Sequence, residues 1–138
     1  MPSLMEKAKK EVQMSDHILY ITMNILNDKK ILISAINHLE KAVVHIMTNE
    51  LKNSRKPIPT NKELMKSMFS QTYVGPKYLL NIIEKIEQIN RTINKEQICY
   101  LKDSNLMIIT NDYKTKVISE EEIKIITNQL KDFLRDKK

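Results

Sequence analysis

Apolar residues recur every three or four positions in three long segments of the chain. The first row is Leu32, Ala35, Leu39, Ala42 and Ile46; the second is Leu79, Ile82, Ile86, Ile89 and Ile93; the third is Ile123, Ile126, Leu130 and Phe133. An α-helix turns once in about 3.6 residues, so each row lies on one helix face and needs a neighbour to cover it. The pattern predicts a mainly α fold, an antiparallel bundle of about four helices.

Capping sequences predict where the helices begin. Ser3, Thr60 and Ser119 are each followed three positions later by a glutamate. This is the S/T-x-x-E capping box, in which two side chains satisfy unpaired backbone N–H groups. Asp28 is the expected cap of a further helix, which carries the first apolar row and ends near Asn53.

The first helix is expected to run from about Leu4 to Asn27. Its second half carries the row Met14, Ile18, Ile21 and Ile25, with Leu19 and Leu26 beside it. Because this half is apolar nearly all round, we expect it to lie at the centre of the bundle.

Proline and glycine mark the remaining helix boundaries. Residues 55–59 contain two prolines, which prevent a helix and favour an extended connection. A short helix over about 61–71 is expected next. Its expected buried residues are Leu64, Met65, Met68 and Phe69. Residues 74–76, with the only glycine, form the next break, and a helix from about 76 to 94 carries the second row.

The pattern changes near the end of the chain. Residues 98–101 and 106–110 are β-prone runs joined by a turn sequence, and residues 115–118 follow another turn at 111–113. A lone hairpin is marginal in water, so this β-hairpin or meander is expected to pack on the bundle. The final C-terminal helix is expected over about 120–135.

The chain is expected to form one domain, with a helical bundle over 1–96, a β-hairpin over 97–118 and a C-terminal helix over 119–138. Its composition, 41% hydrophobic and 29% charged, is typical of a globular protein. No apolar run approaches the ~20 residues that span a bilayer. Residues 1–10 lack the apolar core of a signal peptide, and a lone Cys99 suits a reducing compartment. We therefore expect a cytoplasmic protein that does not bind membranes.

The charge permits two interpretations. The net charge is +6, which suits RNA phosphates, but 20 lysines stand against 3 arginines. Such a bias is also what an AT-rich genome produces at exposed positions, and close phosphate contacts favour arginine. The residues expected to contact nucleic acid are Lys52, Arg55, Lys56, Tyr113, Lys114 and Lys116. Tyrosines that could stack on bases are Tyr73, Tyr78, Tyr100 and Tyr113.

The histidines and the cysteine do not form a recognisable catalytic or metal-binding pattern. His38 and His45 lie seven positions apart, about 10 Å along a helix, which is too far to share a metal. His17 is expected nearer the core face of the first helix. Cys99 is expected to be a small buried residue in a strand. With one glycine, no phosphate-binding glycine loop is present. We expect no cofactor, no metal and no enzymatic activity.

Parts of the chain resemble known proteins. The runs 16–22, 28–32 and 38–42, with 100–103 and 111–113 near the end, resemble small uncharacterised archaeal proteins of helical-bundle type. The paired long helices are also similar to the HEPN superfamily, whose all-helical bundles often act as RNases in dimers. The nuclease members carry an Arg-x4–6-His motif, whereas here all three histidines precede the first arginine. The resemblance therefore implies a non-catalytic binding or dimerising module.

Three functions follow from the sequence as hypotheses. The leading one is a non-enzymatic cytoplasmic protein that binds RNA or a ribonucleoprotein through a lysine-rich surface. The main alternative is a protein–protein interaction module, in particular a homodimer, for which eight methionines could supply an adaptable apolar surface. The third is an enzyme that uses His17 with a carboxylate.

Overall fold

The computed structural model describes residues 3–94, 98–110 and 112–135 of the chain. Its elements in chain order are α1 Leu4–His17, η1 Ile18–Thr22, α2 Met23–Ile25, α3 Lys29–Asn53, α4 Lys62–Thr72, α5 Tyr78–Asn94, β1 Ile98–Lys102, β2 Asn105–Ile109, β3 Thr115–Ile118 and α6 Glu120–Arg135. Segment η1 is π-helical, so α1, η1 and α2 form one interrupted helix. The predicted fold class is confirmed: a helical bundle carries a small antiparallel meander before its last helix.

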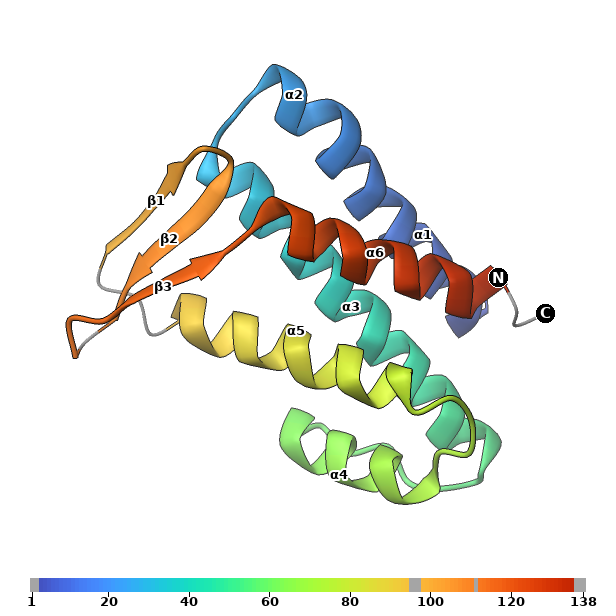
Figure 1. The fold of residues 1–138 in the computed structure, drawn as a ribbon. Coiled ribbons are helices and arrows are strands. Elements are labelled where there is room, and N and C mark those ends of the chain that lie inside the picture. The colour runs from blue at the N-terminus through green and yellow to red at the C-terminus, as the bar shows by residue number, and fades with distance from the viewer. Residues whose placement is uncertain (1–2, 95–97, 111, 136–138) are drawn as a thin grey trace.

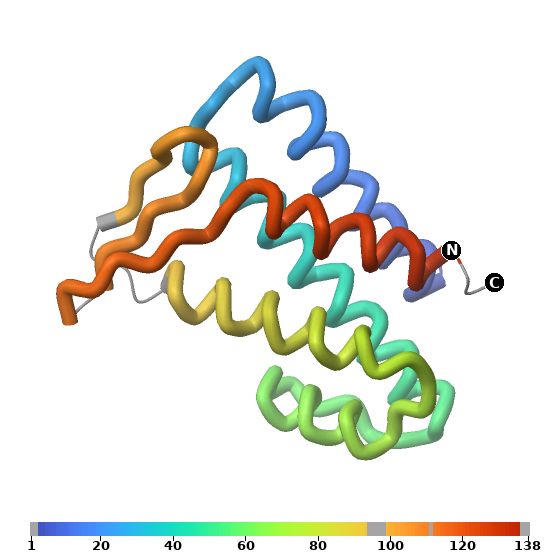
Figure 2. Tube along the Cα trace, viewed as in Figure 1, coloured from blue at the N-terminus to red at the C-terminus, as the bar shows by residue number. Residues whose placement is uncertain are grey.

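Helix α3 is the long central element of the bundle (Figures 1 and 2). Helices α1 and α6 pack together and on one side of α3, while α4 and α5 pack on another. The three strands lie at one end of the bundle, where α3 and α6 begin and α5 ends (Figure 1). No helix in the described part of the chain is long and apolar enough to cross a membrane.

The three apolar rows form the core, as their spacing predicts. Members of each row, such as Leu39, Ile82 and Leu130, are almost fully buried. Leu106 and Ile108 of β2 belong to the same buried cluster, which ties the meander to the helices.

Side chains cap most of the predicted helix starts. The Ser3 and Ser119 hydroxyls accept hydrogen bonds from the N–H groups of Glu6 and Glu122, and Asp28 accepts from the N–H of Lys30. The prediction for Thr60 is wrong by one residue. Helix α4 is capped by Asn61, whose Oδ1 accepts from the N–H of Leu64 at 3.0 Å. Asparagine is at least as good a cap as threonine, so the later start is favoured.

The meander has strand order β1-β2-β3 with both pairs antiparallel. Asp103 and Ser104 form the β1–β2 turn, and both have the positive φ that tight hairpins require. Cys99, Ile108 and Lys116 occupy one cross-strand row. Since Cys99 and Ile108 are buried, this row belongs to the face that packs on the helices. The predicted burial of Cys99 is confirmed.

The predictions of which residues are buried are wrong in two helices. In the first helix the buried row is Ala8, Val12, Ser15, Leu19 and Met23, and not the row from Met14 to Ile25. In α4, Met65 and Phe69 are buried and Met68 partly so, whereas Leu64 is exposed. In both helices the apolar surface is wider than the neighbouring elements cover, so the sequence alone did not identify the side that packs.

Candidate nucleic-acid interface

The six residues predicted to contact nucleic acid lie at opposite ends of the molecule. Lys52 is in the last turn of α3, with Arg55 and Lys56 just after it. Tyr113, Lys114 and Lys116 lie at the other end, in β3 and the turn before it. The two groups are separated by the length of α3, about 36 Å for its 25 residues. They cannot act as one small binding surface.

The first group has a structural role at the end of α3. The N–H of Lys56 donates to the carbonyl of Leu51, and the N–H of Arg55 donates to that of Lys52. Arg55 has φ of 57°, the left-handed conformation found at this position of a Schellman motif. Basic side chains also suit the negative end of the helix dipole. This geometry accounts for the group without any ligand.

The second group is held by a tight turn between β2 and β3. Backbone hydrogen bonds run from the N–H of Thr110 to the carbonyl of Lys114 at 3.0 Å and from the N–H of Tyr113 to the carbonyl of Thr110 at 2.9 Å. The Thr110 hydroxyl also donates to Asp112, and this hydrogen bond is the main reason that the pKa of Asp112 is lowered. Tyr113 adopts a positive φ and is 84% exposed. The turn therefore presents an aromatic ring and Lys114 to solvent.

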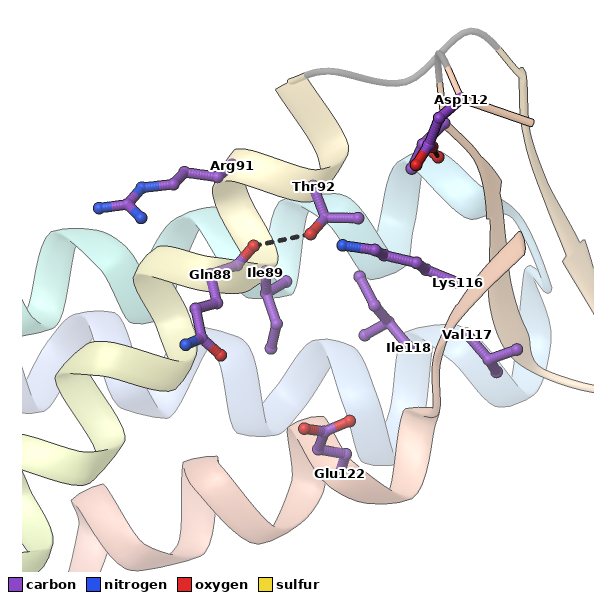
Figure 3. A pocket seen from close by; sticks show the side chains of 10 residues that line it. Gln88, Ile89, Arg91, Thr92, Asp112, Lys116, Val117, Ile118 and Glu122 are labelled. Carbon is purple, nitrogen blue, oxygen red and sulfur yellow. Dashed lines mark hydrogen bonds between the residues drawn. The ribbon is translucent and has the colours of Figure 1, made fainter. Parts of the chain in front are cut away.

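Lys116 differs from the other candidate lysines in its direction. It shares a cross-strand row with buried residues, so it points to the helix side of the sheet, yet β3 is an edge strand and Lys116 stays exposed. Figure 3 shows it extending toward the end of α5 that carries Thr92. In the described part of the chain, Lys116 forms no ion pair within 4.0 Å.

Lys116 lines a pocket of about 680 Å³ between the meander, α5 and α6. The size is within the usual range for sites that hold a small molecule or one unit of a polymer. Its polar lining comes from Gln88, Arg91 and Thr92 of α5, Thr110, Asp112 and Lys116 of the meander, and Glu122 of α6 (Figure 3). Its apolar lining comes from Ile89, Val117 and Ile118.

Some of the charged groups that line the pocket already interact with other residues. Arg91 is ion-paired with Glu87, one turn earlier on α5. The positive charge of Lys116 is one of the smaller causes of the lowered pKa of Asp112. Lys116 and the Gln88 amide therefore remain as the groups most available to an incoming ligand, and Glu122 limits the affinity for a simple anion.

The four tyrosines considered for base stacking fall into two classes. Tyr73 stacks on Phe69 with ring centroids 4.9 Å apart, and Tyr78 meets Phe133 edge-on at 6.4 Å. Both rings therefore pack against another aromatic ring of the protein. Tyr100 points outward from β1 and is 41% exposed, and Tyr113 is more exposed still. Of these four tyrosines, the two most exposed are thus both on the meander.

The histidines do not converge on a site. His17 is exposed, so the prediction that it lies nearer the core face is wrong. His38, and not His17, contacts a carboxylate, that of Glu11. Within the described ranges, no three His, Cys, Asp or Glu side chains are placed to hold a metal ion.

Sequence reasoning missed Gln88, Arg91, Thr92 and Glu122. The first three form the polar side of an amphipathic helix, a pattern shared by most solvent-facing helices. What distinguishes these three residues from other polar residues on helices is their position at the pocket between α5 and β3. No family model, curated protein or solved structure matches the chain. The resemblances to archaeal helical-bundle proteins and to HEPN proteins therefore stay predictions.

Proposed function

We propose that this protein is a non-enzymatic, cytoplasmic RNA-binding protein that contacts RNA, alone or in a ribonucleoprotein, through the meander end of the molecule. The observation that carries the proposal is the position of Lys116 at a polar pocket, without an ion pair among the described residues. Lys114 and Tyr113 lie close by in the chain, in the turn before β3.

The chemistry of this end suits a single-stranded nucleic acid. Lysine ammonium groups attract backbone phosphates regardless of sequence, and exposed aromatic rings stack on unpaired bases. Tyr113 in the turn and Tyr100 on β1 supply the rings. The mixed polar lining of the pocket, with Gln88, Thr92 and Glu122, suits a ligand that carries both hydrogen-bond donors and acceptors. A nucleotide has this combination in its base and its ribose.

Lys116 also has a structural explanation. A charged side chain that points inward from an edge strand discourages the strand from pairing with another chain. This explanation predicts that removing the charge promotes aggregation without any effect on RNA affinity. The two explanations are thus separable by measurement.

The test is a binding titration with a labelled single-stranded RNA of mixed sequence, repeated from about 0.05 to 0.5 M salt. Binding through lysines to phosphates releases counterions, so the logarithm of the affinity is expected to fall linearly with the logarithm of the salt concentration. RNA binding that is absent at low salt, or that does not respond to salt, contradicts the proposal.

A further inference from the structure

Glu122 brings an unpaired carboxylate to the pocket beside Lys116. Its backbone N–H donates to the Ser119 hydroxyl, which is one half of a capping box. The other half is a hydrogen bond from the backbone N–H of Ser119 to the glutamate side chain, and the described part of the chain does not contain it. The side chain of Glu122 is half-buried and extends from α6 toward the pocket instead (Figure 3).

The other carboxylate of the pocket already has partners. Asp112 accepts a hydrogen bond from the Thr110 hydroxyl, and its Oδ2 atom is 3.9 Å from the Nζ of Lys114. It lies at the end of the pocket formed by the turn, away from Glu122 (Figure 3). Glu122 is therefore the carboxylate whose oxygens can accept hydrogen bonds from a ligand.

Lys116 and Gln88 face the same pocket from other elements. Neither Glu122 nor Lys116 forms an ion pair within 4.0 Å in residues 3–94, 98–110 and 112–135. Gln88 extends from α5 toward the side of the pocket where Glu122 lies (Figure 3). A cation and a carboxylate that are not paired with each other suit a ligand with a negative group at one end and N–H donors at the other.

A nucleotide has its charges and donors distributed in this way. Its phosphate is attracted by Lys116 and repelled by Glu122, so the base and not the phosphate belongs beside Glu122. Ile89 and Ile118 supply apolar surface to the pocket, against which the face of a base can pack. The charges thus fix the direction in which a nucleotide enters.

The Glu122 carboxylate also distinguishes between the four bases. Its two oxygens only accept hydrogen bonds, so it pairs best with two N–H groups that lie side by side. Guanine has such a pair, N1–H and the N2 amino group, whereas adenine, cytosine and uracil each have one donor group with an acceptor beside it. The guanine O6 atom, next to N1, is an acceptor that suits the amide N–H of Gln88.

We propose that this pocket binds the base of a guanosine in single-stranded RNA and that Glu122 is the residue that determines this specificity. The inference rests on the proposed binding of RNA at the meander end and adds to it the base that is recognised. Sequence-specific binding of RNA commonly uses unpaired bases in this way, through hydrogen bonds to their exposed edges.

Glu122 also has a structural explanation. Glu120, Glu121 and Glu122 all lie in the first turn of α6, where negative charge interacts favourably with the helix dipole. This explanation predicts that Glu122→Gln and Glu121→Gln lower stability by similar small amounts and that neither changes the preference for a base. The base preference therefore separates the two explanations.

The test compares RNA strands that differ in a single base. Each strand is on the order of eight nucleotides long and consists of uridine, except for one central guanosine, adenosine or cytidine. The wild-type protein is expected to bind the guanosine strand at least about fivefold more tightly than the others, the lower end of what one bidentate contact to a base provides. Glu122→Gln is expected to remove this preference, because its amide replaces one acceptor oxygen with a donor.

Glu121→Gln is the matched control for the change of charge. Glu121 is the preceding residue of α6, is exposed and does not line the pocket. Its substitution removes the same negative charge and is expected to leave the guanosine preference intact. Far-UV circular dichroism checks that both variants keep their helices.

Inosine tests the hydrogen bonds in the wild-type protein, without any variant. It is guanosine without the N2 amino group, so it retains one of the two adjacent donors. The wild-type protein is expected to lose most of its preference when inosine replaces guanosine, whereas Glu122→Gln is expected to bind the two strands equally. This loss of additivity identifies Glu122 as the partner of the N2 amino group.

Several results overturn the inference. Salt-dependent RNA binding without a guanosine preference overturns it and leaves the proposed RNA binding in place. A preference that survives Glu122→Gln, or that Glu121→Gln reduces equally, assigns the discrimination to other groups and also overturns it. If no strand binds at low salt, both the inference and the proposed function are wrong.

Discussion

The Nδ1 atom of His38 on α3 lies 2.6 Å from the Oε2 atom of Glu11 on α1. Both side chains are largely buried, with 15% and 21% of their surface exposed. The Glu11 carboxylate also acts on His45, whose pKa it raises against the larger, opposing effect of burial. Glu11 thus interacts with two histidines seven positions apart, and the three side chains help to fix how α1 packs on α3.

The pH dependence of stability is expected to report on His45. Burial lowers its pKa below the usual 6.5, and the charge of Lys7 acts in the same direction. Between the folded pKa and 6.5, the unfolded chain binds more protons than the folded one. The free energy of unfolding therefore falls as the pH falls through this window. Urea unfolding of wild type and His45→Gln, from about pH 8 to pH 5, is expected to show a smaller fall in the variant.

Glu11→Gln supplies a control for this interpretation. Removing the carboxylate removes the effect that raises the pKa of His45, so an NMR titration is expected to show that pKa moving further down. A His45 pKa at or above 6.5 in the wild-type protein contradicts both expectations.

Lys66 on α4 holds two carboxylates of α5 and is expected to stabilise the packing of these helices. Its Nζ is ion-paired with Glu84 and lies 2.5 Å from Glu87. Burial lowers the pKa of Lys66, but its hydrogen bonds to the two glutamates outweigh burial and raise it. Because the residues are partly exposed, Lys66→Gln is expected to reduce the free energy of unfolding by only about 0.5–1 kcal/mol at pH 7.

Acid weakens this interaction. Burial raises the pKa of Glu87, but Lys66 and Arg91 together outweigh it and hold that pKa below 4.5. The contribution of Glu87 is thus present above pH 4.5 and is lost as the pH falls through its folded pKa. Denaturant unfolding is expected to show a smaller effect of Lys66→Gln at about pH 3 than at pH 7. Lys85→Gln, on an exposed lysine of α5, is expected to change stability by less than about 0.5 kcal/mol.

A buried polar pair joins α1 to α6. The hydroxyl oxygens of Ser15 and Thr127 are 3.3 Å apart, and neither residue is exposed. The Thr127 hydroxyl donates to the carbonyl of Ile123, so Ser15 is the donor to Thr127. Thr127→Val leaves the Ser15 hydroxyl without this acceptor and is expected to cost about 1–3 kcal/mol by urea unfolding. Adding Ser15→Ala should recover much of that loss; no recovery contradicts the pairing.

The helices were largely predictable because their signals are local. Ser119 predicts the start of α6, and the prolines at 57 and 59 predict the break after α3. The side of the first helix that packs was not predictable. Apolar residues nearly surround that helix, and the π turn at Ile18–Thr22, which selects the buried side, has no recognisable sequence signal.

The sequence did not indicate where in the structure the side chains of the candidate site come together. The sequence places Lys52 at the end of a helix and Lys116 in a strand, but it does not indicate that a pocket lies beside either of them. The pocket beside Lys116 is formed by packing, between the meander, α5 and α6. Arg91 and Gln88 line that pocket only because the fold places it between α5 and β3, which are separate segments of the chain.

The structural role of Arg55 leads to a prediction about stability. Its φ of 57° is strained for any residue with a Cβ atom, whereas glycine adopts it freely. Arg55→Gly is therefore expected to raise the free energy of unfolding by about 0.5–1 kcal/mol, measured by denaturant titration. Ser54→Gly, at an ordinary φ of −88°, is expected not to stabilise the protein. If Arg55→Gly destabilises the protein instead, the side chain has a contact that outweighs the backbone strain.

Lysine substitutions at the two ends of the molecule test the proposal that RNA binds at the meander. The pair Lys114→Gln with Lys116→Gln and the pair Lys52→Gln with Lys56→Gln remove the same charge and differ only in position. If RNA binds at the meander, the first pair is expected to reduce the slope of log affinity against log salt by up to about 1.4, because each phosphate of a single strand that a lysine neutralises adds about 0.7 to the slope. The second pair is expected to leave the slope nearly unchanged.

The comparison of the two pairs distinguishes a local site from general attraction. Equal losses for both pairs mean that RNA responds to the net charge of +6 and not to the meander end. A larger loss for Lys52 and Lys56 assigns binding to the end of α3. Tyr113→Ala adds an independent criterion, because a ring that stacks on a base contributes affinity that persists at high salt, whereas the electrostatic attraction of a lysine does not.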